Sequence, residues 1–288
     1  MGVVVNTNIS SITASRILSE NRADLEKAME RLASGKRINS AADDAAGMAV
    51  AAKMRADIGS LNQSVRNTND AISLVNTYDG AAAEIESILI RMRELAVQTR
   101  NGTYEEADRT NANFEYTALK NEITRIAGVS AFNRMTVGQG SSGAAGGTGV
   151  ADTSFTFYVG SDVAKTGNSI SFSAKALDLN LAVSSSTLNS VVDATSAGQA
   201  IATLDDAITE LAANRAQAGA LINRLEHTVS NLMNVSQRLQ EAVSGIEDAD
   251  YAAESANLAR SMVLAQAGTA MLAQANQAPQ YILSLLRG

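Results

Sequence analysis

Residues 204–246 read LDDAITELAANRAQAGALINRLEHTVSNLMNVSQRLQEAVSGI, and this stretch decides the fold. Its apolar residues recur at alternating steps of four and three, which places them on one face of a helix. They are Leu204, Ile208, Leu211, Ala218, Ile222, Leu225, Val229, Leu232, Leu239, Val243 and Ile246. Only Arg215 and Ser236 interrupt the series. A pattern kept over this many heptads predicts a long helix, over about 200–246, that packs as a coiled coil.

The first half of the chain supplies helices that could pack against it. Leu18, Leu25 and Leu32 recur every seven residues and predict a helix over 10–34, which Gly35 would end. A second helical pattern follows over about 50–100. Long helices are favoured throughout, because the chain contains a single proline.

Two details of this first half lead to further predictions. The apolar seam of the second helix shifts its phase near residues 78–80, which suggests a kink or a change of packing partner. Thr103 and Glu106 have the spacing of a capping box, which predicts a third helix over about 104–127.

The middle of the chain, about 131–195, has a different character. Residues 155–159 and 169–174 alternate apolar and polar side chains, with a turn-like stretch at 165–168 between them. This pattern predicts a β-hairpin. Residues 138–149 are rich in Gly, Ser and Ala and are typical of a flexible loop.

Both ends of the chain lack charge. Neither residues 1–15 nor the stretch between Arg260 and Arg287 contains a charged side chain. The C-terminal stretch is long enough to suggest a membrane span, but its glutamines and asparagines would be unpaired in lipid. We therefore expect the two ends to pair with each other and to need further copies of the chain to become fully buried.

The predicted fold is mainly α: a long antiparallel coiled-coil or helix-bundle rod built from the N- and C-terminal segments, with a small β-hairpin region at the middle of the chain. Residues 1–45 with 250–288 would form an inner terminal domain for polymerisation, and residues 46–249 a rod domain. Aromatic residues make up only 4% of the chain, so Ala, Leu, Ile, Val and Met must fill the interior, as they do in helix bundles.

Composition argues against several classes of function. The net charge of −7 gives no general affinity for nucleic acid or for an anionic membrane. The absence of cysteine excludes disulfides, thiolate catalysis and cysteine metal sites. No basic region followed by an apolar one opens the chain, so export through a cleaved signal peptide is not expected.

No catalytic, cofactor-binding or metal-binding site is predicted. His227 is the only histidine and lies off the apolar seam, so a catalytic triad or a zinc site has little to build on. Residues 138–143 match G-x-G-x-x-G, but more Gly and Ala follow instead of a helix, which favours a loop over a dinucleotide site. The acidic residues Glu247, Asp248 and Asp250 lack the pattern of a calcium loop and fit a helix boundary better.

Several motifs are characteristic of one family. They are NTN at 6–8, RLASGKRINS at 31–40, DDAAG at 43–47, RELAVQ at 93–98, FN at 132–133, NRLE at 223–226, DYA at 250–252, QAGTA at 266–270, LAQANQ at 272–277 and SLLR at 284–287. In these motifs the chain resembles bacterial flagellin over roughly residues 1–135 and 200–288. The middle is shorter than in flagellins with large outer domains.

This resemblance implies a structural, non-enzymatic subunit that self-assembles as a homo-oligomer into the helical flagellar filament used for swimming. It implies export by the flagellar type III apparatus to an extracellular filament. The implied partners are an export chaperone, the filament cap and hook-associated proteins, with no nucleic acid and no membrane. The alternative is a hook–filament junction protein of the same superfamily.

The resemblance also implies roles for particular residues. Polymerisation is expected to involve apolar residues of both ends: Ile9, Ile12, Leu18, Leu25, Leu32, Met262, Leu264, Met271, Leu272, Ile282, Leu285 and Leu286. Toll-like receptor 5 of hosts is expected to recognise the monomer through Arg91, Leu95 and Glu115. Glycosylation of the Ser/Thr-rich positions 141–142, 153–154 and 184–187 is a further hypothesis from the family.

Overall fold

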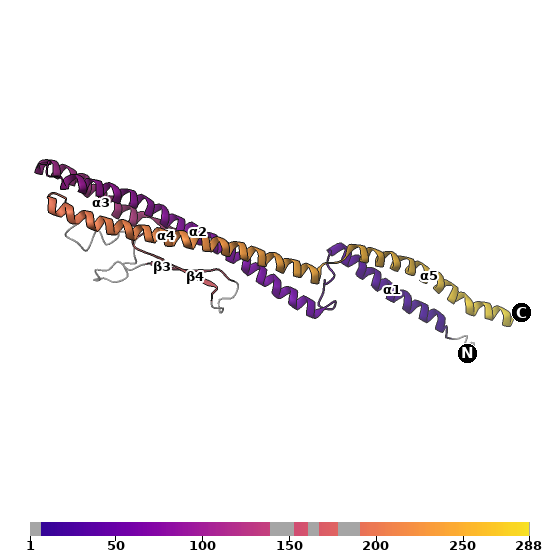
Figure 1. Ribbon diagram of the computed structural model, residues 1–288. Coiled ribbons are helices and arrows are strands. Elements are labelled where there is room, and N and C mark those ends of the chain that lie inside the picture. Colours follow the sequence, from indigo (N-terminus) through magenta and orange to yellow (C-terminus); the bar gives the residue numbers. More distant parts are fainter. Residues whose placement is uncertain (1–6, 139–152, 161–166, 178–190, 288) are drawn as a thin grey trace. The chain divides into compact units, whose positions relative to one another are not determined.

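The computed structural model describes residues 7–138, 153–160, 167–177 and 191–287, apart from the side chains of 278–287. Five helices and four short strands lie in these ranges (Figure 1). The helices are α1 (Ile9–Ser34), α2 (Ala45–Arg100), α3 (Glu106–Val129), α4 (Ala194–Glu247) and α5 (Tyr251–Arg287). The strands are β1 (Ala131–Phe132), β2 (Met135–Thr136), β3 (Thr153–Tyr158) and β4 (Ser169–Ala174). The prediction of a mainly helical chain with a strand pair in its middle is confirmed.

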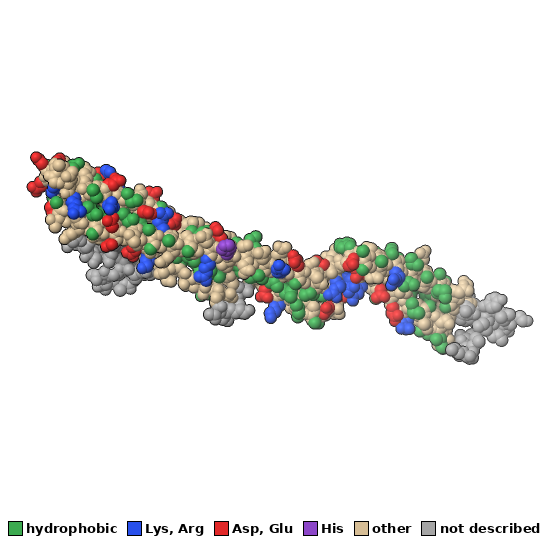
Figure 2. Space-filling view, viewed as in Figure 1, with side chains coloured by type: hydrophobic (Ala, Val, Ile, Leu, Met, Phe, Trp, Pro, Cys, Tyr) green, Lys and Arg blue, Asp and Glu red, His purple; other side chains and the backbone are tan. Residues whose placement is uncertain are grey.

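The chain divides into two compact units. The terminal unit comprises Met1–Ile58 and Gln237–Gly288, and the central unit comprises Gly59–Ser236. Charged side chains of both signs are interspersed along the face shown in Figure 2, with no large region of a single sign. The two units are described separately below.

The core of the central unit is built on two heptad seams. On α4 the seam runs through Leu204, Leu211, Ala218, Leu225 and Leu232, all of them buried as the sequence predicts. Ser236 is buried on the same seam and hydrogen-bonds Asn62 Oδ1 of α2 at 3.3 Å. At the other interruption the buried residue is Asn214, while its neighbour Arg215 lies at the edge of the seam.

The seam of α2 corrects one prediction. Its buried residues are Leu61, Ser64, Thr68, Ala71, Val75, Tyr78, Ala82, Ile85, Leu89, Met92, Ala96 and Thr99. They follow alternating steps of three and four without a break, and α2 is continuous through Gly80. The predicted break in the seam near residues 78–80 is therefore wrong, although α2 also buries Leu74, Ala81 and Leu95 on a second line beside the seam. It resulted from following large aliphatic residues only, whereas Tyr78 and Ala82 occupy the seam there.

Helix α3 lies antiparallel to α2, since the connection between them is short and Arg91 Nε donates to Glu115 Oε1 at 2.9 Å. Tyr116 and Ile123 lie on the buried side of α3 and pack in the core that α3 shares with α2 and α4. The predicted capping box at Thr103 and Glu106 is wrong. Residues 101–104 form a turn, and α3 begins at Glu106, two residues after the predicted start at 104. Glu105 is the N-cap, and Asp108 accepts its N–H at 3.4 Å.

The strands form two antiparallel hairpins. In the predicted one, β3 pairs with β4 from Thr153 opposite Ala174 to Tyr158 opposite Ser169. Phe172 of β4 packs edge-on against Tyr78 of α2, with ring centroids 5.4 Å apart. The other hairpin, β1–β2, was not predicted; Asn133 and Arg134 both have positive φ in its two-residue turn, as a type I′ turn requires.

Candidate assembly interface

The two ends of the chain pair through α1 and α5. Asn8 Nδ2 donates to the carbonyl of Ala275 at 2.7 Å, and Arg31 Nη1 binds Glu254 Oε1 at 2.8 Å. The first residues of α1 therefore lie beside a late part of α5, and the last residues of α1 beside its beginning, so the helices run antiparallel. The prediction that the two uncharged ends of the chain pair with each other is confirmed.

The contact between α1 and α5 is a heptad seam rich in small and polar residues. On α1 it comprises Ser11, Ala14, Leu18, Asn21, Leu25, Ala28 and Leu32, and on α5 Glu254, Leu258, Ser261, Ala265, Gly268, Leu272 and Ala275. Leu18 packs onto Gly268, where an added Cβ would lie 3.2 Å from Leu18 Cδ1. Small residues bring the two backbones close, but they bury little apolar surface, so this pair is held less strongly than the seam of the central unit.

Backbone hydrogen bonds join the two connections that flank this helix pair. Arg37 N donates to Glu247 O at 2.6 Å, and Ala249 N donates to Gly35 O at 3.0 Å. Gly35, at φ 72, ends α1 in the left-handed conformation and lets the chain turn into this bridge. These bonds hold the connection that follows α1 beside the connection that precedes α5.

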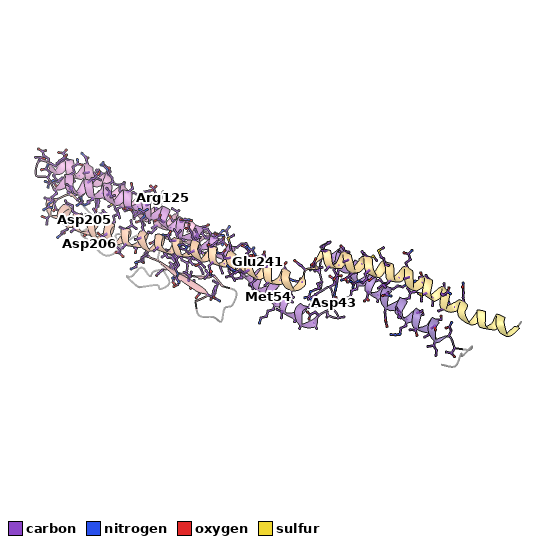
Figure 3. All side chains as sticks on the ribbon, turned by 45° about the vertical axis from the view of Figure 1, so that its right-hand side comes forward. Asp43, Met54, Arg125, Asp205, Asp206 and Glu241 are labelled. Atoms are coloured by element: carbon purple, nitrogen blue, oxygen red, sulfur yellow. The ribbon has the colours of Figure 1, made fainter. Side chains whose placement is uncertain are left out.

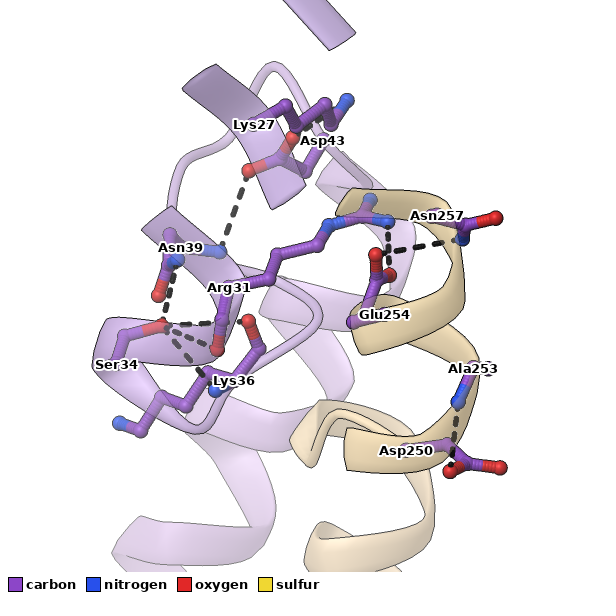
Figure 4. A network of polar contacts seen from close by, with 10 residues as sticks. All are labelled: Lys27, Arg31, Ser34, Lys36, Asn39, Asp43, Asp250, Ala253, Glu254 and Asn257. Carbon is purple, nitrogen blue, oxygen red and sulfur yellow. Dashed lines mark hydrogen bonds and ion pairs between the residues drawn. The ribbon is translucent and has the colours of Figure 1, made fainter. Parts of the chain in front are cut away.

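Ion pairs lie near this bridge, and two of them, Lys27 with Asp43 and Arg31 with Glu254, are drawn in Figure 4. The Glu247 carboxylate is buried and contacts the cations of Arg55 and Lys36. Asp43 accepts from Lys27 Nζ at 2.9 Å and from two backbone N–H groups of the turn, those of Asn39 and Ser40. These contacts, led by Lys27, hold the pKa of Asp43 well below its ordinary value. Glu247, Asp248 and Asp250 lie at the end of α4 and the start of α5, as expected for helix-boundary acids.

Large apolar side chains remain exposed on the helix pair. Exposed fractions are 67% for Ile9, 61% for Ile12, 57% for Met262, 44% for Leu264 and 65% for Met271. Several of them line a groove of about 480 Å³ between the helices, whose walls include Ile9, Thr13, Ile17, Leu264, Ala267 and Met271. A folded monomer gains nothing from such exposure, so this groove is a candidate interface.

The residues predicted for polymerisation thus fall into three groups. Leu18, Leu25, Leu32 and Leu272 face the seam between α1 and α5. Ile9, Ile12, Met262, Leu264 and Met271 are exposed around it. The side chains of Ile282, Leu285 and Leu286 lie outside the described residues. The groove itself was not predicted. The apolar residues of α1 that lie outside the heptad series of Leu18, such as Ile9 and Ile17, are the part of the sequence that could have indicated it.

The residues predicted for receptor recognition lie in the central unit. Arg91 and Glu115 are both about half exposed and form an ion pair between α2 and α3, and Glu94 binds the same guanidinium at 3.1 Å. These hydrogen bonds, first that to Glu115, raise the pKa of Arg91 above its usual value. Leu95 is only 2% exposed and belongs to the core. It therefore supports the surface around Arg91 and Glu115 from below and contributes almost no exposed area to it.

The described residues hold little else that suggests chemistry. Their His, Asp and Glu side chains form no group of three or more that could hold a metal ion. None of the helices described is both long and apolar enough for a bilayer crossing. His227 is exposed on α4. The predicted glycine-rich loop from residue 139 onwards, the first half of the predicted turn at 165–168 and the Ser/Thr positions 141–142 and 184–187 lie outside the described residues.

Comparisons with known proteins identify the architecture. The model of the bacterial flagellin N-terminal helical region matches residues 5–142, and that of the C-terminal helical region matches residues 201–286. A flagellin of Halalkalibacterium halodurans is 42% identical over 99% of this chain and 100% of its own length. The flagellar filament 33 kDa core protein of Treponema phagedenis is 39% identical over the same shares.

A further relative by sequence agrees with these two. A flagellin of Listeria monocytogenes is 37% identical over 98% of this chain and 99% of its own. The crystal structure of Bacillus cereus flagellin is 33% identical, covers 58% of this chain and 88% of that chain, and aligns with a TM-score of 0.47.

Paired terminal helices with exposed apolar surface are consistent with a structural protein that assembles with copies of itself. With both terminal regions matched and relatives similar over the full length, the chain belongs to the bacterial flagellin family. It is a structural subunit of a flagellar filament, a homopolymer, and not an enzyme.

Proposed function

We propose that copies of this chain polymerise through the exposed apolar surface of the α1–α5 pair. The observation that carries the proposal is the groove of about 480 Å³ bordered by Ile9, Ile17, Leu264 and Met271. Covering such surface contributes about 25 cal/mol for each Å² of apolar area removed from water. Repeated at every copy, this contribution would hold the filament together.

A truncation tests this proposal. A chain that ends at Ala265 loses Gly268, Leu272 and Ala275 from the seam and Met271 from the groove. The central unit should keep its thermal unfolding transition, because none of its residues is removed. Filaments should no longer sediment in the ultracentrifuge. Normal sedimentation of the truncated chain would show that polymerisation uses another surface.

We further propose that the subunit leaves the cell through the flagellar export apparatus and is added to an extracellular filament beneath a cap. An export chaperone would cover the exposed apolar residues of α5, among them Met262, Val263 and Leu264, before export. A pull-down of the full chain from export-deficient cells should recover one small dedicated partner, and a chain that ends at Arg260, which lacks these residues, should recover less of it.

Recognition of the monomer by Toll-like receptor 5 is also proposed, with Arg91 and Glu115 as the contacting pair. An exposed Arg beside an acid, with a rigid core beneath, is a typical contact residue of protein interfaces. Arg91→Ala should lower signalling in receptor-expressing cells at least about tenfold, as the loss of a single interface anchor does.

Arg125 of α3 provides the matched control (Figure 3). It forms an exposed ion pair with Glu122 at 2.6 Å, on the same helix as Glu115. Arg125→Ala should leave signalling unchanged. Equal losses from both variants, or silence of the unaltered monomer, would rule out this site.

A further inference from the structure

The turn between α2 and α3 contains the single Asn-Gly pair of the sequence, Asn101-Gly102. Both residues are exposed, and no hydrogen bond joins the Asn101 side chain or the Gly102 N–H to the described residues. A Cβ added to Gly102 would meet nothing within 4 Å. Glycine also adopts a wider range of backbone conformations than other residues. The Gly102 nitrogen therefore has the room to approach the carboxamide carbon of Asn101.

The main-chain carbonyl oxygen of Asn101 accepts two hydrogen bonds. Tyr104 N donates to it at 3.4 Å, and Arg109 Nη2 of α3 donates to it at 3.2 Å. When the Gly102 N–H loses its proton, the negative charge spreads onto this oxygen, because both atoms belong to one conjugated peptide group. A hydrogen bond from a cation stabilises the charged oxygen more than the neutral one. Arg109 therefore makes the Gly102 nitrogen a better nucleophile.

We propose that Asn101 is a deamidation site whose reaction the fold promotes through Arg109. Hydroxide removes the proton of the Gly102 N–H, and the nitrogen attacks Cγ of Asn101. The new N–Cγ bond closes a succinimide ring, while the Cγ–Nδ2 bond breaks and ammonia leaves with a proton from water, which restores the hydroxide. Water then opens the ring at either carbonyl and leaves aspartate or isoaspartate at position 101. The reaction consumes only water.

The isoaspartate product fits the same contact. When water attacks the former main-chain carbonyl of Asn101, its oxygen becomes part of a free carboxylate, and Arg109 Nη2 already donates to that oxygen. The bond then joins two opposite charges and becomes stronger. Arg109 Nε, which is buried and has no hydrogen-bond partner among the described residues, is a second donor on the same guanidinium. Isoaspartate should therefore be the main product.

Two related pairs of residues are protected by their surroundings. At Asn39-Ser40 the nucleophile is engaged, because Ser40 N donates to Asp43 Oδ2 at 3.0 Å. Asp79-Gly80 could close the same ring, but it lies inside α2, where the helix holds each backbone N–H in a hydrogen bond. Asn101 should therefore react before either of these pairs.

Peptide mapping of the full chain tests the site. The chain is incubated in mildly alkaline buffer and digested, and the mass of each peptide is followed as OH replaces NH₂. The peptide that contains Asn101 should change first. An isoaspartyl methyltransferase with labelled S-adenosylmethionine, used as the probe, should label the same peptide. Gly102→Ala should slow the reaction at least about tenfold, because a Cβ restricts the backbone rotation that ring closure needs.

Arg109→Ala tests the contribution of the fold. The rate at Asn101 should fall at least about threefold in the folded chain, the effect of losing one hydrogen bond to a charged group. Arg109→Lys keeps the cation and should recover part of the rate. Arg125→Ala, which removes a cation paired with Glu122 on the same helix, is the control and should leave the rate unchanged. In urea the unfolded chain lacks the contact, so Arg109→Ala and the unaltered chain should react equally fast.

Three outcomes overturn the inference. Equal rates for Arg109→Ala and the unaltered chain in the folded state would remove the role of the guanidinium. Earlier deamidation of another asparagine would remove the site. A glycan on Asn101, which with Gly102 and Thr103 also fits the acceptor pattern N-x-T, would block the reaction. None of these measurements requires the chain to polymerise, so they leave the proposed function untouched.

Discussion

Replacing Tyr116 with Phe should stabilise the central unit. Tyr116 is fully buried between α2, α3 and α4, and its hydroxyl has no hydrogen-bond partner among the described residues. A buried hydroxyl without a partner costs about 1–3 kcal/mol of desolvation, and phenylalanine keeps the ring that fills the site. We expect Tyr116→Phe to raise the free energy of unfolding at neutral pH by about 1 kcal/mol.

The same residue should make the unaltered protein sensitive to alkali. Burial raises the pKa of Tyr116 from 10.0 to about 12. The unfolded chain then loses its phenolic proton at a lower pH than the folded one, so stability is complete below pH 10 and falls as the pH rises towards 12. The loss is about 1.4 kcal/mol at pH 11 and about 2.7 kcal/mol once both states are ionised.

Urea unfolding followed by circular dichroism, near pH 7 and pH 11, measures both effects. The advantage of Tyr116→Phe over the unaltered chain should grow between the two pH values by about 1.4 kcal/mol. Tyr158→Phe, at a half-exposed position of β3, is the control and should show no such growth. A Tyr116→Phe variant that is less stable at neutral pH would mean that the hydroxyl is hydrogen-bonded after all, and the reasoning would fail.

Three further predictions concern backbone and charge. Gly80→Ala should raise the free energy of unfolding by about 0.5–1 kcal/mol in urea titrations, since the position is helical and an added Cβ meets nothing within 4 Å; a loss would reveal a kink at this position. Gly138→Ala should lower it by about 1–3 kcal/mol, because the new Cβ would lie 2.8 Å from the backbone oxygen of Ala127, and an unchanged midpoint would contradict that contact. Asp43→Asn should lower the thermal midpoint of the terminal unit at neutral pH. Because the pKa of Asp43 is depressed, the stability that its charge contributes is complete above the ordinary pKa of 3.8 and is lost only as the pH falls below that value. The midpoints of the variant and the unaltered chain should therefore converge in acid, and a constant difference would mean that charge is not the cause.

Periodicity predicted the helices well because burial in a two-helix seam depends on position more than on residue type. The series through Leu204 and Leu232 is buried as expected, and Leu18 faces α5. The same rule failed on α2 where Tyr78 and Ala82 take seam positions, since neither belongs to the aliphatic residues that the pattern followed.

Contacts between distant segments could not be predicted in this way. The packing of Leu18 on Gly268, the bridge between residues 35–37 and 247–249, and the burial of Leu95 all depend on the registry of one helix against another. Sequence periodicity gives the face of a helix and leaves this registry open. The capping residue Glu105 was missed for a simpler reason: Thr103 is the commoner type of N-cap residue, but residues 101–104 form a turn and the helix starts at Glu106.

The pairing of α1 with α5 joins residues that are 267 positions apart, as the bond from Asn8 to Ala275 shows. The ribosome adds about 5–20 residues each second, so α1 waits for some tens of seconds before α5 exists. The central helices, whose contacts are closer in sequence, can form during that time, and closing the longest loop comes last because its entropy cost is the greatest. Each newly made chain therefore passes through a period in which its first helix is without its partner, and any factor that handles the nascent chain meets that helix first.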